Sequence, residues 1–287
     1  MSDTSWQKNL EEIIKARIQN LVRVSGGDIN QSYQITTASK EYFLKVNPNL
    51  QALSMFQTEK QGLELLGSVE NVQVPYPTRV VKLSQDLYGL LMPFYEVSQS
   101  SDAYWKDLAQ QLSLIHRSTY SHFGLHSDNY IGTLTQKNDL FESWGNFYAT
   151  TRILPIAKIC RDASYLNPLE CSSIERLCLR FGEIYPLEAP SLLHGDLWSG
   201  NILNSMDQRA IFIDPAIYYG HREMDIAMTQ LFGGFSSLFL ETYNSLFALA
   251  KGWESRLKYS QLYYLLVHLA LFGPSYHRSV KAIISRF

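Results

Sequence analysis

One short polar segment near residue 195 limits what this chain can fold into more than any other feature. It follows the pattern His-x-Asp-x-x-x-x-Asn, with Asp196 and, five residues later, Asn201. Asp214 stands thirteen residues further on, directly after the apolar run 211–213. We expect that run to be a short strand that carries Asp214 out of its end. The fold must therefore bring a loop and a strand end together, so that two carboxylates and a carboxamide meet.

This set of side chains is typical of phosphoryl transfer. One carboxylate positions the acceptor hydroxyl and takes its proton, while a carboxamide and a second carboxylate hold Mg²⁺ against the phosphates. Protein kinases use the same five-residue step between their catalytic aspartate and their metal-binding asparagine. The chain contains no GxxxxGK[ST] motif, which excludes a P-loop kinase at the level of the motif.

The N-terminal part of the chain offers the remaining parts of such a site. Gly26 and Gly27 precede a strand and let backbone N–H groups approach phosphate oxygens. Lys45 lies in the next predicted strand, and Glu59 lies on the apolar stripe of the helix that follows. A Gly-Gly turn or a strand lysine alone is usually structural. Their order ahead of the polar segment indicates a phosphate-binding lysine and its carboxylate partner.

The periodicity of the chain predicts an α+β protein with two lobes of the protein-kinase kind. The small β-rich lobe spans 1–95 and binds nucleotide, and the larger, mainly helical lobe spans 96–287 and carries the catalytic and substrate-binding residues. The expected elements are a helix over 4–21, strands over 33–36 and 41–46, a helix over 52–66, strands over 78–83 and 88–92, and helices over 103–118, 237–251 and 260–272.

Composition excludes several other classes of protein. Hydrophobic residues make up 46% of 287 residues, which is enough for a full hydrophobic core without the support of disulfides or bound metal ions. The net charge of −2 argues against a broad surface for nucleic acid. Three cysteines without a CxxC pair, at 160, 171 and 178, fit core side chains better than disulfides or zinc ligands. The chain starts without a signal-peptide pattern, and its longest apolar stretch, 262–272, is too short to span a membrane. We therefore expect a soluble cytoplasmic protein.

The residues that fill these motifs resemble one family closely. LLHGDLWSGN at 192–201 is similar to the fructosamine kinases, also called ketosamine-3-kinases, within the kinase-like phosphotransferases that include aminoglycoside and choline kinases. The segments 214–225, 231–235 and 261–273 show the same likeness, as do 25–29, 43–47 and 56–59. The resemblance covers about residues 10–280, practically the whole chain.

The resemblance implies an ATP- and Mg²⁺-dependent enzyme that phosphorylates the C3 hydroxyl of ketosamines, the sugar adducts of amines, either as small molecules or bound to proteins. The phosphate beside the C2 carbonyl is easily eliminated, which frees the amine. The implied roles are general base for Asp196, Mg²⁺ ligands for Asn201 and Asp214, phosphate binding for Gly26, Gly27 and Lys45, orientation of Lys45 for Glu59, the adenine hinge for Met92 and Phe94, and substrate contact for Trp198 and His268.

Several alternatives stay open at this point. Trp198 could instead pack its own loop, and His268 could be a core histidine on an apolar helix. Among ketosamines we favour ribulosamines over fructosamines and erythrulosamines. An aminoglycoside- or choline-type kinase is the nearest other enzyme, and a nucleotide-binding pseudokinase would have lost residues that are present here. A monomer is favoured. Many relatives carry cysteine where this chain has Asp28, so a thiol switch at that position cannot be transferred.

Overall fold

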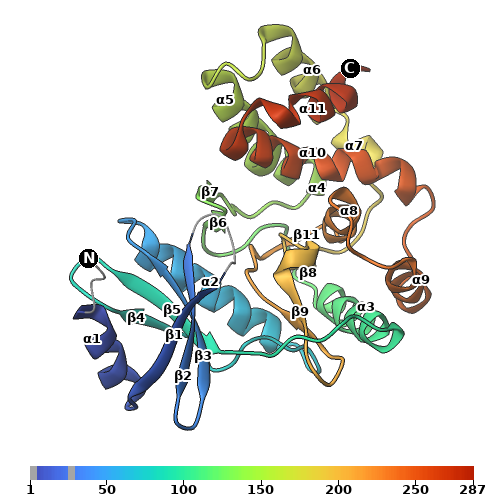
Figure 1. The fold of residues 1–287 in the computed structure, drawn as a ribbon. Coiled ribbons are helices and arrows are strands. Elements are labelled where there is room, and N and C mark those ends of the chain that lie inside the picture. Colours follow the sequence, from blue (N-terminus) through green and yellow to red (C-terminus); the bar gives the residue numbers. More distant parts are fainter. Residues whose placement is uncertain (1–4, 25–29) are drawn as a thin grey trace.

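The computed structural model describes residues 5–24 and 30–287 and arranges them in two lobes (Figure 1). The smaller lobe is built on a five-stranded antiparallel sheet with the order β1-β2-β3-β5-β4. Its strands are β1 (Ile18–Val24), β2 (Gln31–Thr37), β3 (Glu41–Asn47), β4 (Arg79–Lys82) and β5 (Tyr88–Pro93). This lobe agrees with the β-rich N-terminal lobe that the periodicity predicts.

Side chains alternate along β3 and separate the two faces of this sheet. Leu44 and Val46 join the core that forms under α1 (Ser5–Ile14), while Phe43 packs against the cluster of α2 (Ala52–Gly67). Lys45 has the same parity as Phe43, so it points toward α2. The predicted alternation in this strand therefore directs the lysine to the helix that carries Glu59.

The prediction of one helix over 4–21 is wrong in its second half. The helix α1 ends at Ile14, Lys15 takes a positive φ of 55°, and 18–24 form strand β1. The backbone N–H of Ile18 donates to the Glu11 carboxylate at 2.7 Å, which fixes the chain reversal. Apolar residues three positions apart suit one face of a helix, but β-branched residues in this stretch also suit a strand that pairs with β2.

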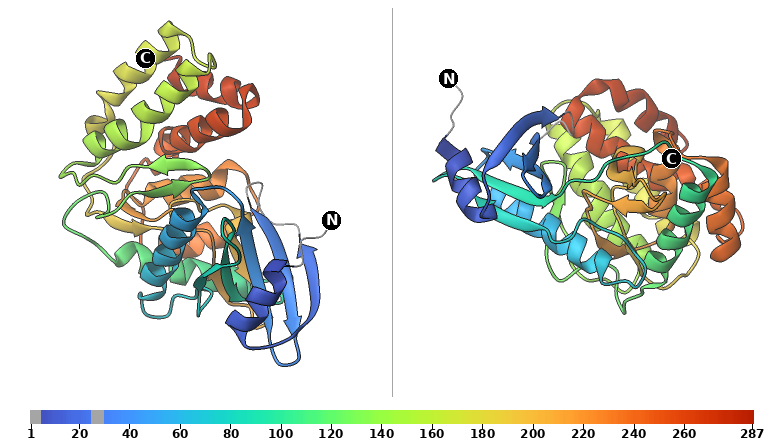
Figure 2. Two further views of the ribbon diagram at one scale, coloured as in Figure 1. Left: turned by 90° about the vertical axis from the view of Figure 1, so that its left-hand side faces the viewer. Right: turned by 60° about the horizontal axis from the view of Figure 1, so that its bottom comes forward.

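The larger lobe is mainly helical and forms a separate body next to the sheet and α2 of the smaller lobe (Figures 1 and 2). Its long elements are α3 (Asp102–Arg117), α5 (Leu154–Asp162), α6 (Pro168–Cys178), α8 (Glu223–Leu231), α9 (Ser237–Leu246), α10 (Trp253–Phe272) and α11 (His277–Ile284). The short helices are α4 (Trp144–Phe147) and α7 (Phe181–Ile184), with a π-helical segment (Tyr148–Ile153) and 3₁₀ turns (Ser199–Asn201, Pro274–Tyr276). Helix α9 stops five residues before the predicted end, and α10 begins seven residues before the predicted start at 260.

Three two-stranded ribbons lie between the helices and the sheet and carry the polar segment. They pair β6 (Asn129–Ile131) with β7 (Leu134–Gln136), β8 (Ser191–Leu193) with β11 (Tyr218–Gly220), and β9 (Ile202–Asn204) with β10 (Ala210–Phe212). The predicted strand before Asp214 is therefore β10, which ends one residue before the apolar run does.

Apolar packing joins the two lobes as well as filling them. Leu66 of α2 belongs to the same buried cluster as Leu192, Phe212 and Ile217 of the larger lobe. The three cysteines are free thiols, with Cys160 and Cys178 buried, in agreement with a role in the core. In the part of the chain that is described, no helix has the length and apolar character that crossing a bilayer requires. The lobe boundary expected at 95/96 lies between β5 and α3 and stays a prediction.

Candidate active site

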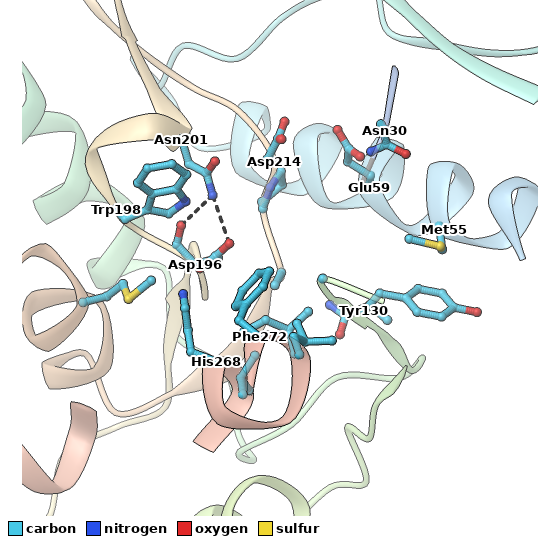
Figure 3. A pocket seen from close by; sticks show the side chains of 18 of the residues that line it. Asn30, Met55, Glu59, Tyr130, Asp196, Trp198, Asn201, Asp214, His268 and Phe272 are labelled. Carbon is cyan, nitrogen blue, oxygen red and sulfur yellow. Dashed lines mark hydrogen bonds between the residues drawn. The ribbon is translucent and has the colours of Figure 1, made fainter. Parts of the chain in front are cut away.

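A cavity of about 740 Å³ opens between the lobes and holds most of the residues singled out from the sequence (Figure 3). Its volume is in the range of small-molecule sites. Residues from both lobes line it: Asn30, Lys45, Met55, Thr58, Glu59, Asn129, Tyr130, Ile131, Gly132, Asp196, Trp198, Asn201, Asp214, Pro215, Ala216, Met228, Phe232, Val267, His268, Leu271, Phe272, Ser275 and Tyr276.

The loop that carries Asp196 packs tightly against the segment after Asp214. Gly195 has a φ of +84°, and a Cβ at this position would lie 2.0 Å from the carbonyl oxygen of Ala216. Only glycine fits there. The buried Asp225 carboxylate accepts the backbone N–H groups of His194 at 2.7 Å and Gly195 at 2.9 Å. These contacts fix the backbone that presents Asp196.

Asp225 is itself held from behind by a buried chain of hydrogen bonds. Nε2 of His116 lies 3.2 Å from the Asp225 carboxylate, and Nδ1 lies 2.7 Å from the Tyr243 hydroxyl. Burial lowers the pKa of His116, so the ring is neutral. The carboxylate only accepts, so Nε2 donates to it and Nδ1 accepts from Tyr243. Helix α3 thus supports the loop that carries Asp196 through one defined tautomer of His116.

His194 links the two segments that carry the carboxylates. Its Nε2 lies 2.9 Å from the carbonyl oxygen of Ile213, and its Nδ1 lies 3.3 Å from the backbone N of Asp196. The carbonyl only accepts, so Nε2 carries the proton and Nδ1 accepts from Asp196. Burial lowers the pKa of His194, which keeps the ring neutral. This histidine fastens the loop and has no nitrogen left for proton transfer.

Asp196 and Asn201 form one unit within this loop. Nδ2 of Asn201 donates to the Asp196 backbone carbonyl at 2.9 Å and to its carboxylate at 3.0 Å (Figure 3). Burial raises the pKa of Asp196 to about 7, and the negative charge of Asp214 acts in the same direction. The hydrogen bond from Asn201 opposes both. The carboxyl group is therefore poised to exchange a proton near neutral pH.

Lys45 links strand β3 to helix α2 and to the segment that follows β10. Its Nζ lies 2.7 Å from Glu59 of α2 and also forms an ion pair with Asp214. Burial opposes the lysine charge, but the carboxylates of Asp214 and Glu59 outweigh it and raise the pKa of Lys45. Burial raises the pKa of Glu59 to about 7, against the lowering effect of Lys45. The predicted pairing of the strand lysine with the helix carboxylate is present.

The opposite end of the cavity is aromatic. Trp198 is 39% exposed, and the ring of His268 lies among Phe232, Phe272 and Tyr276, with ring centroids 4.7, 5.4 and 5.0 Å away. Nδ1 of His268 lies 2.8 Å from the carbonyl oxygen of Tyr264, so it carries the ring proton. Burial lowers the pKa of His268, which leaves Nε2 of the neutral ring as an acceptor. Figure 3 shows this ring turned toward Asp196.

Three members of this aromatic end were not predicted from the sequence. They are Phe232, Phe272 and Tyr276, which lie at or just beyond the ends of α8 and α10. Aromatic residues in an apolar helical pattern indicate core packing at least as strongly as a site. Their exposure, 41% for Phe232 and 48% for Phe272, is the signal that distinguishes them, and it exists only in the folded chain.

Some predicted residues lie elsewhere. Gly26 and Gly27 fall outside the described residues, as does Asp28. Met92 is 3% exposed and packs with Ala52 and Phe56, so it is not part of the cavity wall. The backbone N–H of Phe94 donates to the Glu41 carbonyl at 3.2 Å, and its side chain does not line the cavity either. The adenine hinge stays a prediction.

The donor atoms near Asp196 fit a hard divalent cation. Asn201 offers an amide oxygen and Asp214 a carboxylate, which are ligands that Mg²⁺ accepts together with phosphate oxygens and water. Within residues 5–24 and 30–287, no group of three or more His, Cys, Asp or Glu side chains could hold a metal ion. An ion at this place would complete its shell with phosphate oxygens or water.

Comparison with known proteins identifies the family. The fructosamine kinase family model matches residues 2–287. The chain belongs to the fructosamine kinase family. A probable ketoamine kinase of Enterococcus faecium is 40% identical over 93% of this chain and 95% of its own length. The chloroplastic protein-ribulosamine 3-kinase of Arabidopsis thaliana is 31% identical over 94% of this chain and 83% of its own length. The predicted family, and with it a kinase for ketosamines, is confirmed.

Solved structures confirm the predicted kinase-like fold of this family member. A crystal structure of a Thermobifida fusca protein named as a fructosamine-3-kinase has a TM-score of 0.86 at 29% identity, covering 99% of this chain and 98% of that one. A thermostable mutant of the aminoglycoside phosphotransferase APH(4)-Ia, in a ternary complex with AMP-PNP and hygromycin B, has a TM-score of 0.66 at 18% identity, with 98% of each chain covered. At that identity the second likeness shows the fold alone.

Proposed function

We propose that this fructosamine kinase transfers the γ-phosphoryl group of ATP to the C3 hydroxyl of a ketosamine. The observation that carries the proposal is the meeting of Asp196, Asn201, Asp214 and the Lys45–Glu59 pair at one end of a cavity whose other end is aromatic. The names of the relatives, ketoamine kinase and protein-ribulosamine 3-kinase, support this class of acceptor.

The nucleotide would bind between the lobes. Lys45 points its ammonium group into the cavity, where it can contact phosphate oxygens while Glu59 holds it in place. Gly26 and Gly27 would cover the phosphates, and the backbone near Met92 and Phe94 would meet adenine. Asn201 and Asp214 would hold Mg²⁺, which supplies positive charge beside the phosphates when bound. Asp214 would then leave Lys45, its partner in the structure.

Proton transfer falls to Asp196. As the C3 oxygen bonds to the γ-phosphorus, the bond from that phosphorus to the bridging oxygen of ATP breaks and ADP departs. The hydroxyl proton passes to the Asp196 carboxylate, whose pKa of about 7 allows it to accept and then release a proton near neutral pH. Asn201 keeps this carboxylate directed at the acceptor through its 3.0 Å hydrogen bond.

The acceptor would lie against the aromatic end. The indole of Trp198 offers a flat surface for the C–H face of a sugar. Nε2 of His268 can accept a hydrogen bond from a hydroxyl or from the protonated amine. Among the described residues that line the cavity, the only carboxylates are Glu59, Asp196 and Asp214, and all three belong to the phosphoryl end. A polycationic aminoglycoside would find no acidic wall here, which favours the ketosamine.

The proposed product is chemically unstable. A phosphate on C3 is a good leaving group next to the C2 carbonyl, so the product undergoes elimination and releases the amine. We also infer a cytoplasmic monomer without a nucleic-acid partner, with a nucleotide-binding lobe over 1–95 and a catalytic lobe over 96–287.

The test is ATP-dependent release of ADP with a ribulosamine and a fructosamine side by side, and with Asp196→Asn as the control. We expect turnover that requires the ketosamine and is lost in the control, and faster turnover of the ribulosamine. Binding of Mg-ATP without turnover of either sugar would contradict the proposal. Activity with an aminoglycoside or an amino alcohol in a panel would then identify the other acceptor.

A further inference from the structure

Gly200 lies unusually close to the indole of Trp198. A Cβ added to Gly200 would lie 2.2 Å from Cη2, 2.5 Å from Cζ2 and 2.5 Å from Cζ3 of the Trp198 ring. These three distances are nearly equal, which places the added Cβ above the face of the ring. A point beyond the ring edge at Cη2 would lie clearly farther from Cζ2 and Cζ3 than from Cη2. The six-membered part of the indole therefore lies flat over the Cα of Gly200.

The backbone at this position does not itself require glycine. Gly200 is in the 3₁₀ turn 199–201 and does not have a positive φ. Gly233 and Gly234, by contrast, have φ of +75° and +89°. Gly200 is also solvent-exposed, so no buried neighbour demands a small residue there. The three atoms nearest to an added Cβ all belong to Trp198. The requirement for glycine therefore comes from the indole.

The turn cannot simply move away from the ring. The Asn201 backbone N–H donates to the Trp198 carbonyl at 3.0 Å, and the Ile213 backbone N–H donates to the Asn201 carbonyl at 3.0 Å. On the outside, a Cβ at Gly234 would lie 2.7 Å from Oγ of Ser199, so the 233–234 segment presses on the same turn. A methyl group at position 200 would displace the indole, whose two side-chain torsions are the softest degrees of freedom present.

We infer that Gly200 is a positioning residue that holds the indole of Trp198 flat at the acceptor end of the cavity, so that its free face binds the sugar. This inference rests on the proposed function for the nature of the acceptor. One face of the ring lies on Gly200, and Trp198 lines the cavity while remaining 39% exposed. Gly200 touches neither reactant and acts only through the ring.

Kinetics of Gly200→Ala test the inference. We expect the KM for the ketosamine to rise about fivefold, the scale of one lost stacking contact, while kcat and the KM for ATP change less than about twofold. Trp198→Ala should have a similar effect. The double variant should match Trp198→Ala, because the three atoms nearest to the added methyl group all belong to the ring that this variant lacks. Gly182→Ala is the matched control, since a Cβ at Gly182 has no neighbour within 4 Å.

Two outcomes would overturn the inference. The first is an unchanged ketosamine KM in Gly200→Ala. The second is an equal loss from Gly200→Ala in the Trp198→Ala background, which would show that the glycine serves the loop and not the ring. A spectroscopic test works without any acceptor. The near-ultraviolet circular dichroism of Gly200→Ala should differ from that of the parent, and this difference should vanish in a Trp198→Phe background. Failure of the proposed function would leave that difference intact, whereas failure of the inference would abolish it.

Discussion

The two ends of the cavity are built on different principles. At the phosphoryl end, each charged side chain has a partner of opposite charge or a hydrogen bond of defined length, as in the contacts of Lys45 with Glu59 and of Asn201 with Asp196. At the acceptor end, aromatic rings pack against the ring of His268, and the hydrogen bond that His268 forms within the described residues goes to the backbone of its own helix. Ion pairs and hydrogen bonds therefore hold the side chains of the first end in place, and packing of aromatic rings holds those of the second.

This difference has a kinetic meaning. Charged groups that meet the transferring phosphoryl group act on the transition state, so their loss lowers kcat. A packed aromatic surface binds the acceptor in the ground state and the transition state alike, so its loss raises KM. Substitutions at the two ends should therefore separate into a kcat class and a KM class.

The largest effect is expected for Asp196→Asn. The variant keeps the size of the side chain but cannot accept the hydroxyl proton, so kcat should fall by about 10² or more, the scale of losing a general base. Mg-ATP should still bind, because the groups that contact phosphate are unchanged. Single-turnover ADP release together with nucleotide titration measures both quantities. Near-normal turnover would remove Asp196 from its role.

Lys45→Met should have the next largest effect. The apolar side chain leaves Glu59 buried without its cation and removes the contact to phosphate, so kcat/KM for ATP should fall by about tenfold to 10². The ketosamine KM should change much less, because Lys45 lies at the other end of the cavity. Steady-state kinetics with each substrate varied in turn measure this split. Lys60→Met is the matched control, because it removes an exposed ion pair with Glu64 on α2, the helix that carries Glu59. An unchanged kcat/KM for ATP would contradict the assignment of this lobe to nucleotide.

The pH dependence should also report on the phosphoryl end. The pKa of Asp196 is raised to about 7 by burial, so the base is protonated below that pH in the free enzyme. The kcat/KM for the ketosamine should therefore rise about tenfold per unit below pH 7 and level off above it. A profile that is flat from pH 5.5 to 8 would contradict the raised pKa.

The stability of the free protein gives an independent check with a defined sign. A carboxyl group whose pKa is higher in the folded than in the unfolded chain holds its proton more tightly when folded, so stability falls as pH rises from about 4 to 7. Above pH 7 the folded chain carries a buried charge. Asp196→Asn removes it, so this variant should melt higher than the parent at pH 8 and no higher at pH 4.5. Thermal unfolding at the two pH values measures the difference.

The phosphoryl end could be predicted from the sequence because its chemistry restricts residue types. A lysine in a strand is not specific by itself, but its order with a glutamate on an apolar helical stripe and an aspartate after a short strand is unusual enough to predict the site. The alternation along β3 then gave the direction of Lys45. By contrast, the end of α1 depends on Lys15 adopting a positive φ, which the apolar spacing of 4–21 does not reveal.

The acceptor end could be predicted only in part, and the reason is physical. Trp198 and His268 were found through the resemblance to the family. Phe272 lies one helical turn after His268 at the end of α10, and the 3₁₀ turn that follows brings Tyr276 beside them. The contact between Gly200 and the indole depends on a side-chain rotamer. The contact of Tyr276 with His268 and that of Gly200 with the indole come from how the folded chain packs, and no residue pattern specifies them.

The smallest effect is expected for Phe272→Ala, and it tests the comparison most directly. The ring is 48% exposed and packs at 5.4 Å from His268, so its removal takes away acceptor surface without exposing a deep core. The ketosamine KM should rise about threefold, the scale of a partly exposed aromatic contact, with kcat and the KM for ATP unchanged. Leu246→Ala, a similarly exposed apolar residue away from the cavity, is the control. If Phe272→Ala instead lowered kcat and left KM alone, the acceptor end would share in the transition state, and the separation between a kcat class and a KM class would fail.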